Sequence, residues 1–354
     1  MSDSSLVASL VVAFALTTAF MFILRPIAIG ADLVDRPGGR KSHIGDVPVI
    51  GGIAMFIGMF AGIHTLTGFD TGISSVMLGS LILVMAGVAD DMHPVPAAVR
   101  LIAQISTVLI MAYGADLLLY ELGDPFGTGL ISLGPFALIF TMAVTLTMIN
   151  AYNLIDGADG LAGTLTLFAL LPLAVVAGPG NVNGAIAFIA SAVVIAFLLF
   201  NFPVPWNRRI RSFMGDAGST MLGFTVVWVA LGVSQGPERL ISPVHCLWFA
   251  AIPIYDCLTC FVRRSLAGKS PFTPGRDHFH HTLLRGGLRP RRTLALLTGT
   301  QAIYSCVGLL AFFSGIPDVA MFAGWSVLGL SQRFVIKTIA KRWRGSRIRR
   351  HRAI

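Results

Sequence analysis

Long apolar runs, separated by short polar segments, repeat along the entire chain. Each run is about 17 to 20 residues long, which lets a helix cross the roughly 30 Å hydrocarbon core of a bilayer. A helix is the expected form because a backbone surrounded by lipid must satisfy its hydrogen bonds internally. We predict ten or eleven membrane spans, from the segments Leu6–Leu24, Val49–Leu66, Ile73–Ala89, Ala98–Leu118, Leu130–Ile149, Leu161–Ala177, Gly184–Phe200, Ser219–Val233, Val244–Val262, Thr293–Phe313 and Val319–Ile336.

The composition agrees with this pattern. The sequence of 354 residues is 55% hydrophobic and only 12% charged, and its mean hydropathy is +0.78. These values exclude an ordinary soluble globular protein. We therefore predict an all-α, polytopic integral membrane protein in which residues 1–340 form a single transmembrane domain and residues 341–354 form a basic tail.

The basic residues predict the orientation. No positive charge precedes the first span, and Arg25 follows it, which favours an uncleaved helix with its N-terminus outside. If alternate loops are cytoplasmic, every Lys and Arg except Arg239 lies on the cytoplasmic side, including the C-terminus. The net charge of +9 is therefore concentrated at one membrane face, where anionic lipid explains it better than nucleic acid.

One polar stretch between apolar runs, NAYNLIDGADG at Asn150–Gly160, stands out. It contains Asn150, Asn153, Asp156 and Asp159. Their spacing gathers these side chains on one helical face or in one tight loop, which is typical of a site for a hard cation or a nucleotide. A polar turn that only connects two spans is the alternative.

Further acids lie at predicted cytoplasmic ends of spans. Asp90 and Asp91 are adjacent, and their mutual repulsion at a membrane edge indicates a cation or a proton role rather than a simple cap. Asp216 lies between Gly215 and Gly218, whose flexible backbone lets a carboxylate approach a ligand closely. We therefore treat all three acids as candidate site residues.

Basic and histidine residues on the same face are candidate phosphate contacts. They are Lys41 and His43 in the first loop, Arg100 near the start of the fourth span, and His278, His280 and His281 in the longest loop. The H-x-H-H pattern lacks the i, i+4 pairing of helical zinc sites. Phosphate contact is therefore the favoured interpretation, although basic loops also simply follow the positive-inside rule.

The ninth predicted span contains polar residues close to its cytoplasmic end. Asp256 there indicates a structural or supporting partner, because a carboxylate within a span is costly. Cys257 and Cys260 form a C-x-x-C without a second pair, which favours core packing over zinc or redox chemistry.

Acids and amides that can hold Mg²⁺, opposite basic groups that can hold phosphate oxygens, are the components of phosphoryl transfer. The membrane location implies that one reactant is a lipid. A transporter would place ionisable groups near the bilayer midplane, often in repeated halves. The sequence shows no clear internal repeat, and its charges lie at loop edges. An enzyme is therefore favoured over a transporter.

Five ordered motifs carry a family resemblance. They are DRPGGRKSHIGDVPVIGG, ADD, NAYNLIDGADGLAG, FMGDAGS and SPFTPGRDHFHH. Over about residues 5–340 the chain resembles the polyprenyl-phosphate N-acetylhexosamine-1-phosphate transferases. This resemblance implies that residues 1–340 transfer a sugar 1-phosphate from a UDP-sugar to undecaprenyl phosphate and release UMP. Because Phe279 interrupts the histidine triplet, the chain resembles the branch that uses UDP-N-acetylglucosamine. Another UDP-N-acetylhexosamine, or phospho-muramyl-pentapeptide, remains the alternative substrate.

The resemblance also implies roles for the candidate residues. Asp216 and Asn153 hold Mg²⁺, for which Mn²⁺ can substitute, and Asp90 keeps the lipid phosphate deprotonated with support from Asp91. Asp156 and Asp159 orient the uridine, while Asn150 serves loop structure. The phosphate contacts are Arg100, His278, His280, His281, Lys41 and His43.

The family resemblance further implies a location and partners. We expect a multi-pass protein of the bacterial cytoplasmic (inner) membrane, with its active site on the cytoplasmic face. Its partners are UDP-N-acetylglucosamine, undecaprenyl phosphate and membrane lipids, with no nucleic acid, and a homodimer is left open. The product is the first lipid-linked sugar of a cell-surface polysaccharide, such as a lipopolysaccharide O antigen. The choice between a single displacement and a covalent intermediate is also left open.

Overall fold

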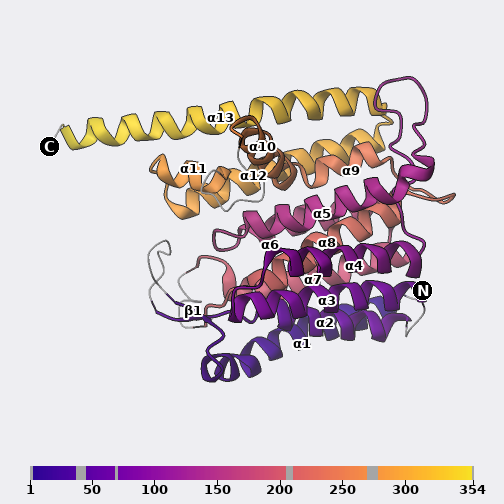
Figure 1. The fold of residues 1–354 in the computed structure, drawn as a ribbon, viewed down its shortest axis with the longest axis horizontal. Coiled ribbons are helices and arrows are strands. Elements are labelled where there is room, and N and C mark those ends of the chain that lie inside the picture. Colours follow the sequence, from indigo (N-terminus) through magenta and orange to yellow (C-terminus); the bar gives the residue numbers. More distant parts are fainter. Residues whose placement is uncertain (1–2, 37–44, 68–70, 205–209, 269–277, 353–354) are drawn as a thin grey trace.

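The computed structural model describes residues 3–36, 45–67, 71–204, 210–268 and 278–352. Long helices lie side by side along one direction, from α1 to α4 at the bottom of Figure 1 to α13 at the top. The helices are α1 (Asp3–Gly30), α2 (Gly51–Thr67), α3 (Thr71–Met92), α4 (Ala97–Gly114), the short 3-10 helix η1 (Gly134–Phe136), α5 (Ala137–Ile155), α6 (Leu161–Ala177), α7 (Val182–Asn201), α8 (Gly215–Ser234), α9 (Pro243–Phe249), α10 (Ala251–Leu266), α11 (Phe279–Arg285), α12 (Pro290–Phe313) and α13 (Asp318–Arg352).

Every predicted span corresponds to apolar helix. Within the described residues, eight helices are long and apolar enough to cross a membrane, and the pair α9–α10 adds a ninth if it counts as one span. The apolar helices α2 and α6 are shorter. The prediction of an all-α polytopic membrane protein is thus confirmed, whereas the number of spans and the orientation remain predictions. The proposed division at residue 340 falls inside α13, which continues across it.

The predicted span at Val244–Val262 is not one continuous helix. A bend of 89° follows Phe249 and separates α9 from α10. Gln301 of α12 satisfies the backbone groups that the bend frees. Its side-chain oxygen accepts from the Ile252 N–H at 2.8 Å, and its amide nitrogen donates to the carbonyls of Trp248 and Phe249, each at 3.0 Å. A broken helix is tolerated in a membrane where neighbouring side chains supply such bonds.

Helix α8 lies at the centre of the bundle. In its most apolar window 89% of the residues are buried. Glycines allow its neighbours to approach closely: a β-carbon at Gly87 of α3 would overlap the backbone of Ala217. A β-carbon at Gly223 would lie 2.8 Å from the carbonyl oxygen of Met148 in α5. Small residues serve this purpose between membrane helices. The C-terminal ends of α3 and α5 therefore meet the N-terminal end of α8.

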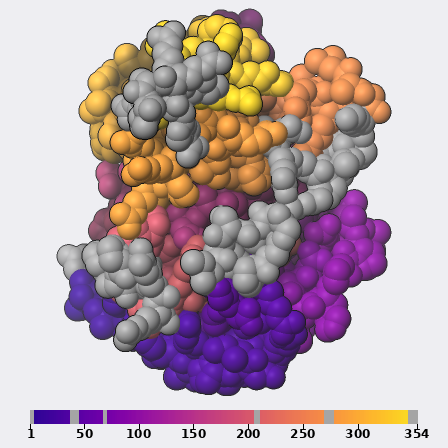
Figure 2. Space-filling view, turned by 90° about the vertical axis from the view of Figure 1, so that its left-hand side faces the viewer, coloured from indigo at the N-terminus to yellow at the C-terminus, as the bar shows by residue number. Residues whose placement is uncertain are grey.

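We call this end of the bundle, on the left of Figure 1, the polar end. Here β1 (Val34–Asp35) pairs antiparallel with β2 (Val47–Pro48), a small addition to the predicted all-α fold. Ser212 donates to the carbonyl of Pro48 at 2.8 Å, and Val49 forms a parallel bridge with Phe213. These contacts fix the segment that enters α8. Figure 2 shows the polar end face on, with N-terminal elements below and C-terminal helices above.

Candidate active site

Three acids converge at the polar end. Asp90 and Asp91 end α3, and Asp216 lies in the first turn of α8. The backbone N–H of Asp216 donates to the Asp91 carboxylate at 3.2 Å. This approach requires Gly215, which has φ +67°, because a β-carbon there would overlap Asp91. Gly215 therefore makes room for Asp91 beside Asp216, whereas the approach of Asp216 to a ligand remains a prediction.

Arg100 links two of these acids. Its guanidinium donates to Asp90 at 2.8 Å and lies 3.8 Å from a carboxylate oxygen of Asp216. The Val95 N–H also donates to Asp90 at 2.7 Å, so the side chain of Asp90 is held from two sides. The side chain of Arg100 remains 43% exposed, which leaves the guanidinium accessible to an incoming anion. Whether it contacts a substrate phosphate remains a prediction.

The predicted pair Asn153 and Asp216 is in direct contact. The Asn153 amide donates to Asp216 at 2.8 Å and to Ser219 at 3.1 Å. Asn153 lies in the last turn of α5, and α5 packs against α8. Two residues that are distant in sequence are therefore neighbours because two helices cross.

The residues around this pair fit Mg²⁺. The available donors are carboxylate and amide oxygens, which are the ligands that this hard cation prefers. One carboxylate oxygen of Asp91 is buried and has no hydrogen-bond partner. An orphaned buried carboxylate oxygen beside Asp216 is what a cation or a substrate group would satisfy. Asp216, Asn153 and Asp91 are therefore the residues that would hold the metal.

Asp156 and Asp159 lie on the loop that follows α5. Desolvation, and then the charges of Asp216, Asp91 and Asp159, raise the pKa of Asp156 well above its ordinary value. Asp159 forms an ion pair with Arg211, in the segment that enters α8. Arg211 was not among the predicted site residues, because nothing in the local sequence distinguishes it from the neighbouring basic residues.

The expectation that Asn150 serves loop structure is wrong. Asn150 lies inside α5, where its amide donates to Gln104 of α4 at 3.0 Å and to the carbonyl of Leu146 at 2.7 Å. The predicted fifth span ended too early because polar residues in NAYN resemble a loop. In the structure their side chains make contacts that allow the helix to continue to Ile155.

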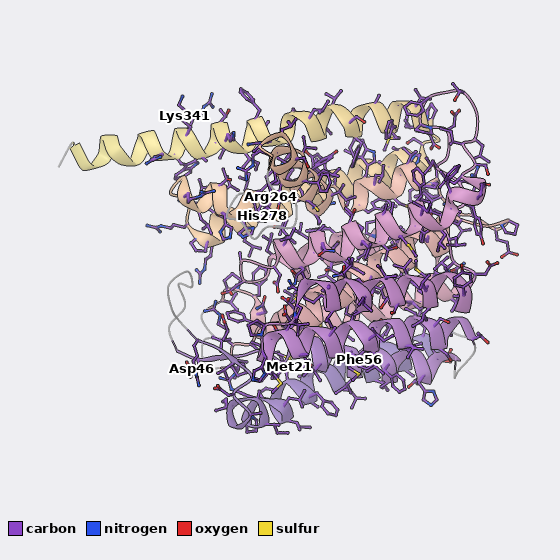
Figure 3. All side chains as sticks on the ribbon, in the orientation of Figure 1. Met21, Asp46, Phe56, Arg264, His278 and Lys341 are labelled. Atoms are coloured by element: carbon purple, nitrogen blue, oxygen red, sulfur yellow. The ribbon has the colours of Figure 1, made fainter. Side chains whose placement is uncertain are left out.

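The histidine group is tied to Asp256. Asp256 is 1% exposed and accepts from His278 Nδ1 at 3.0 Å and from the Phe279 N–H at 2.8 Å. Desolvation alone lowers the pKa of His278, but hydrogen bonds to Asp256 and Cys260 outweigh it and raise the pKa to about 9. His278 is therefore a cation at neutral pH. Figure 3 labels His278, which directly precedes the first residue of α11.

His280 connects this group to the loop after α5. A β-carbon at Gly157 would overlap its imidazole, so the ring lies against the segment that carries Asp156. Desolvation, followed by the charges of His281 and His278, lowers the pKa of His280 to about 3. The rings of His280 and His281 lie 4.1 Å apart. His280 is neutral at physiological pH and would contact a phosphate by a hydrogen bond rather than by charge.

Asp256, Cys260 and His278 also form a compact buried cluster. In the part of the chain that the structure describes, their ligand atoms lie within 4.8 Å of one another, close enough to hold a metal ion. The His278 Nδ1 already lies between the carboxylate and the thiol, at 3.0 and 3.5 Å. We interpret the cluster as hydrogen bonding around a protonated ring. The i, i+4 spacing of Asp256 and Cys260 was the signal for it in the sequence.

Two candidates lie outside the described residues. Lys41 and His43 fall in the segment 37–44, so their predicted phosphate contacts remain predictions. The other ten candidates, Asp90, Asp91, Arg100, Asn153, Asp156, Asp159, Asp216, His278, His280 and His281, all lie toward the polar end.

The fold and site define a class, and sequence comparison agrees with it. A helical membrane bundle with oxygen ligands and cationic groups at one end is a scaffold for phosphoryl transfer on a lipid. The sequence profile of glycosyl transferase family 4 matches residues 73–234. Together with the relatives described below, this shows that the chain belongs to glycosyl transferase family 4. The resemblance seen in the five motifs is thus confirmed.

Several curated relatives are similar over nearly their whole length. An undecaprenyl-phosphate alpha-N-acetylglucosaminyl 1-phosphate transferase of Escherichia coli O157:H7 is 34% identical, over 92% of this chain and 89% of the relative. Proteins of the same name from Yersinia pestis and Pasteurella multocida are 34% and 35% identical. They align over 96% and 97% of this chain and over 92% and 96% of their own lengths.

Proposed function

We propose that the chain transfers N-acetylglucosamine 1-phosphate from UDP-N-acetylglucosamine to undecaprenyl phosphate and releases UMP. The observation that carries this proposal is the meeting of Asp90, Asp91, Asn153 and Asp216 at one end of a membrane bundle, with Arg100 across two of the acids. The names of the relatives supply the substrates. The identity of the sugar is therefore inferred from the relatives, and the type of reaction is inferred from the site.

In the proposed reaction an oxygen of the lipid phosphate attacks the β-phosphorus of the UDP-sugar. The bond from that phosphorus to the bridging oxygen breaks, and UMP leaves with the bridging oxygen. Asp90, held in place by Arg100, keeps the attacking phosphate deprotonated. Asp216, Asn153 and Asp91 would hold Mg²⁺, whose charge would reduce the repulsion between the two phosphate reactants.

Asp156, Asp159 and the histidines come from other elements than the paired acids of α3, namely the loop after α5 and the start of α11. Asp156, whose pKa is raised by burial and by the neighbouring acids, lies on the loop after α5, and we assign it to the uridine side of the site. Asp159 is positioned by its ion pair with Arg211. His278, as a cation, suits contact with a phosphate oxygen of the nucleotide.

We propose that the protein lies in a bacterial inner membrane and that its polar end faces the cytoplasm. The distribution of Lys and Arg supports this orientation, since nearly all of them fall in loops on one side. A UDP-sugar is a cytoplasmic metabolite class, which agrees with a site on that face. The lipid-linked product would serve as the first sugar of a surface polysaccharide.

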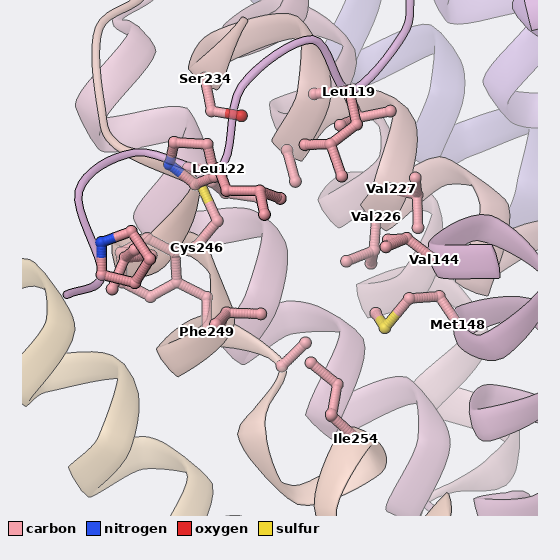
Figure 4. Close-up of a pocket in the computed structure, with 18 of the residues that line it drawn as sticks. Leu119, Leu122, Val144, Met148, Val226, Val227, Ser234, Cys246, Phe249 and Ile254 are labelled. Atoms are coloured by element: carbon pink, nitrogen blue, oxygen red, sulfur yellow. The ribbon is translucent and has the colours of Figure 1, made fainter. Parts of the chain in front are cut away.

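An apolar cavity of about 250 Å³ suits the lipid reactant. Figure 4 shows Val144 and Met148 of α5, and Val226 and Val227 of α8, pointing into it. Ile254, two residues before Asp256, also lines it. We infer that part of the polyprenyl chain lies here, because such a chain makes only apolar contacts.

The proposal is tested by UMP release from purified protein given Mg²⁺, undecaprenyl phosphate and a panel of UDP-N-acetylhexosamines. We expect release with UDP-N-acetylglucosamine and loss of at least about 100-fold in Asp216→Asn. Asp46→Asn, which alters an exposed acid at the same end, is the control and should retain activity. Absence of UMP with every sugar would refute the function.

A further inference from the structure

A second cavity, of about 180 Å³, lies between α10, α11 and α13. Four of the side chains that line it are basic: Arg263 from α10, Arg285 from α11, and Arg333 and Lys337 from α13. No acidic residue is among the described residues that line it. We call it the basic cavity. Three separate helices thus direct positive charge into one space.

This arrangement carries an electrostatic cost. Arg333 and Lys337 are one helical turn apart, and like charges at i, i+4 destabilise a helix. Neither side chain has an ion pair or a hydrogen bond to any residue in the described ranges. Arg333 is half-buried, so water screens its charge only in part. An anion in the basic cavity would remove this repulsion.

The basic cavity is separate from the acid cluster. Phe279, which is 2% exposed, lines it, and the backbone N–H of Phe279 is held by Asp256. His280, the next residue, lies instead against Gly157 of the acidic loop. Helix α11 therefore has the candidate active site on one side and the basic cavity on the other. A nucleotide bound to the acids would not occupy it.

The position of the cavity suggests the source of the anion. The apolar part of α13 precedes it, and Lys341 and Trp343 follow it, with the guanidinium of Arg292 4.9 Å from the centre of the Trp343 ring. Tryptophan and basic side chains are typical of the level of the lipid head groups. Ile336 and Phe279 give the cavity apolar walls as well.

We propose that the basic cavity binds a phosphate group, supplied by the head group of an anionic phospholipid, and so ties α13 to α10 and α11. Arg333 and Lys337 are the principal contacts, assisted by Arg263 and Arg285. The phosphate has one alternative source, a free phosphate ion from the cytoplasm, which has the same chemistry. The site is independent of the proposed reaction.

Native mass spectrometry of the full-length protein in neutral detergent tests this proposal. We expect wild-type protein to retain phosphatidylglycerol in preference to phosphatidylcholine. The Arg333→Gln/Lys337→Gln variant should bind phosphatidylglycerol at least about ten-fold more weakly, since each basic side chain near a lipid surface contributes about 1 kcal/mol. Arg289→Gln/Arg291→Gln, exposed at the start of α12, is the matched control and should keep wild-type affinity.

Inorganic phosphate distinguishes the two sources. If it displaces phosphatidylglycerol and raises the melting temperature of wild-type protein but not of the double variant, the cavity takes free phosphate. If only the lipid binds, the head group is the ligand. The proposal is overturned if the double variant binds phosphatidylglycerol as tightly as wild type, or if wild type does not discriminate between the two lipids. The melting temperature of the unliganded variant checks that it is folded.

Discussion

Single residues decide how the acids approach one another. Asn153 and Asp216 were paired from the family resemblance, and their 2.8 Å hydrogen bond confirms that they are neighbours. Their local sequences contain no information about which helices cross. Arg211 was missed for the same reason, because its partner Asp159 is reached only through the tertiary fold.

Gly215 gives the sharpest prediction at this scale. Gly215→Ala should lower activity by at least about 100-fold, because the new β-carbon would displace Asp91 from beside Asp216. Stability should fall by about 1–3 kcal/mol. Gly236→Ala is the control, since Gly236 also has positive φ but nothing within 4 Å of its β-carbon position. Equal turnover in the two variants would contradict this account of the site.

The Asp256–His278 contact predicts a pH dependence. The pKa of His278 is raised from 6.5 to about 9. The contribution of this contact to the stability of the folded state is therefore complete below about pH 6.5 and is lost as the pH rises through 9. In Asp256→Asn the pKa of His278 should fall. The alkaline limb of the kcat/KM profile should then move to lower pH. Cys260, His280 and His281 are left unmutated in this variant. An alkaline limb that does not move would show that Asp256 does not position His278.

At the scale of elements, apolar length predicted where helices lie but not where one breaks. The run at Val244–Val262 has the length and hydropathy of one span, and Gln301, which stabilises its bend, lies on a different helix. The polar residues near the end of α5 had the opposite effect, because they led to a predicted span that ends at Ile149, before the helix does. There the helix continues because Asn150 finds a partner on α4.

Gln301→Leu should destabilise the protein because it leaves backbone groups at the bend without partners. Each such buried group costs about 1–3 kcal/mol. Thr300→Leu is the control, since the hydroxyl of Thr300 bonds only within its own helix. Thermal unfolding in detergent measures the difference. Similar melting temperatures for the two variants would show that Gln301 does not hold the bend.

Filling the apolar cavity tests its role in lipid binding. Ala230 lines this cavity between α8 and α9, and Ala230→Phe should raise the KM for undecaprenyl phosphate by about ten-fold or more. The KM for the UDP-sugar should change little, because the nucleotide side of the site lies elsewhere. Ala143→Phe adds the same bulk on the exposed face of α5 and serves as the control. An equal rise of this KM in both variants would show that the polyprenyl chain does not bind in the cavity.

At the scale of the whole molecule, the bundle separates two chemistries. Apolar helices surround α8, and the charged groups gather where the C-terminal ends of α3 and α5 meet the N-terminal end of α8. The membrane class followed from composition, and gathering of polar residues on one face followed from the loop pattern. The close packing of helix ends that turns those residues into one site depends on glycines such as Gly87, whose partners the sequence does not reveal.

The proposed reaction moves a sugar 1-phosphate, not a bare sugar, to the lipid. Reaction of the purified protein with UDP-N-acetylglucosamine labelled at the β-phosphorus tests it directly. Attack at that phosphorus predicts that all transferred label appears in the lipid product and that unlabelled UMP is released. Label released as UDP, with an unlabelled lipid, would place the attack on the sugar carbon and contradict the account.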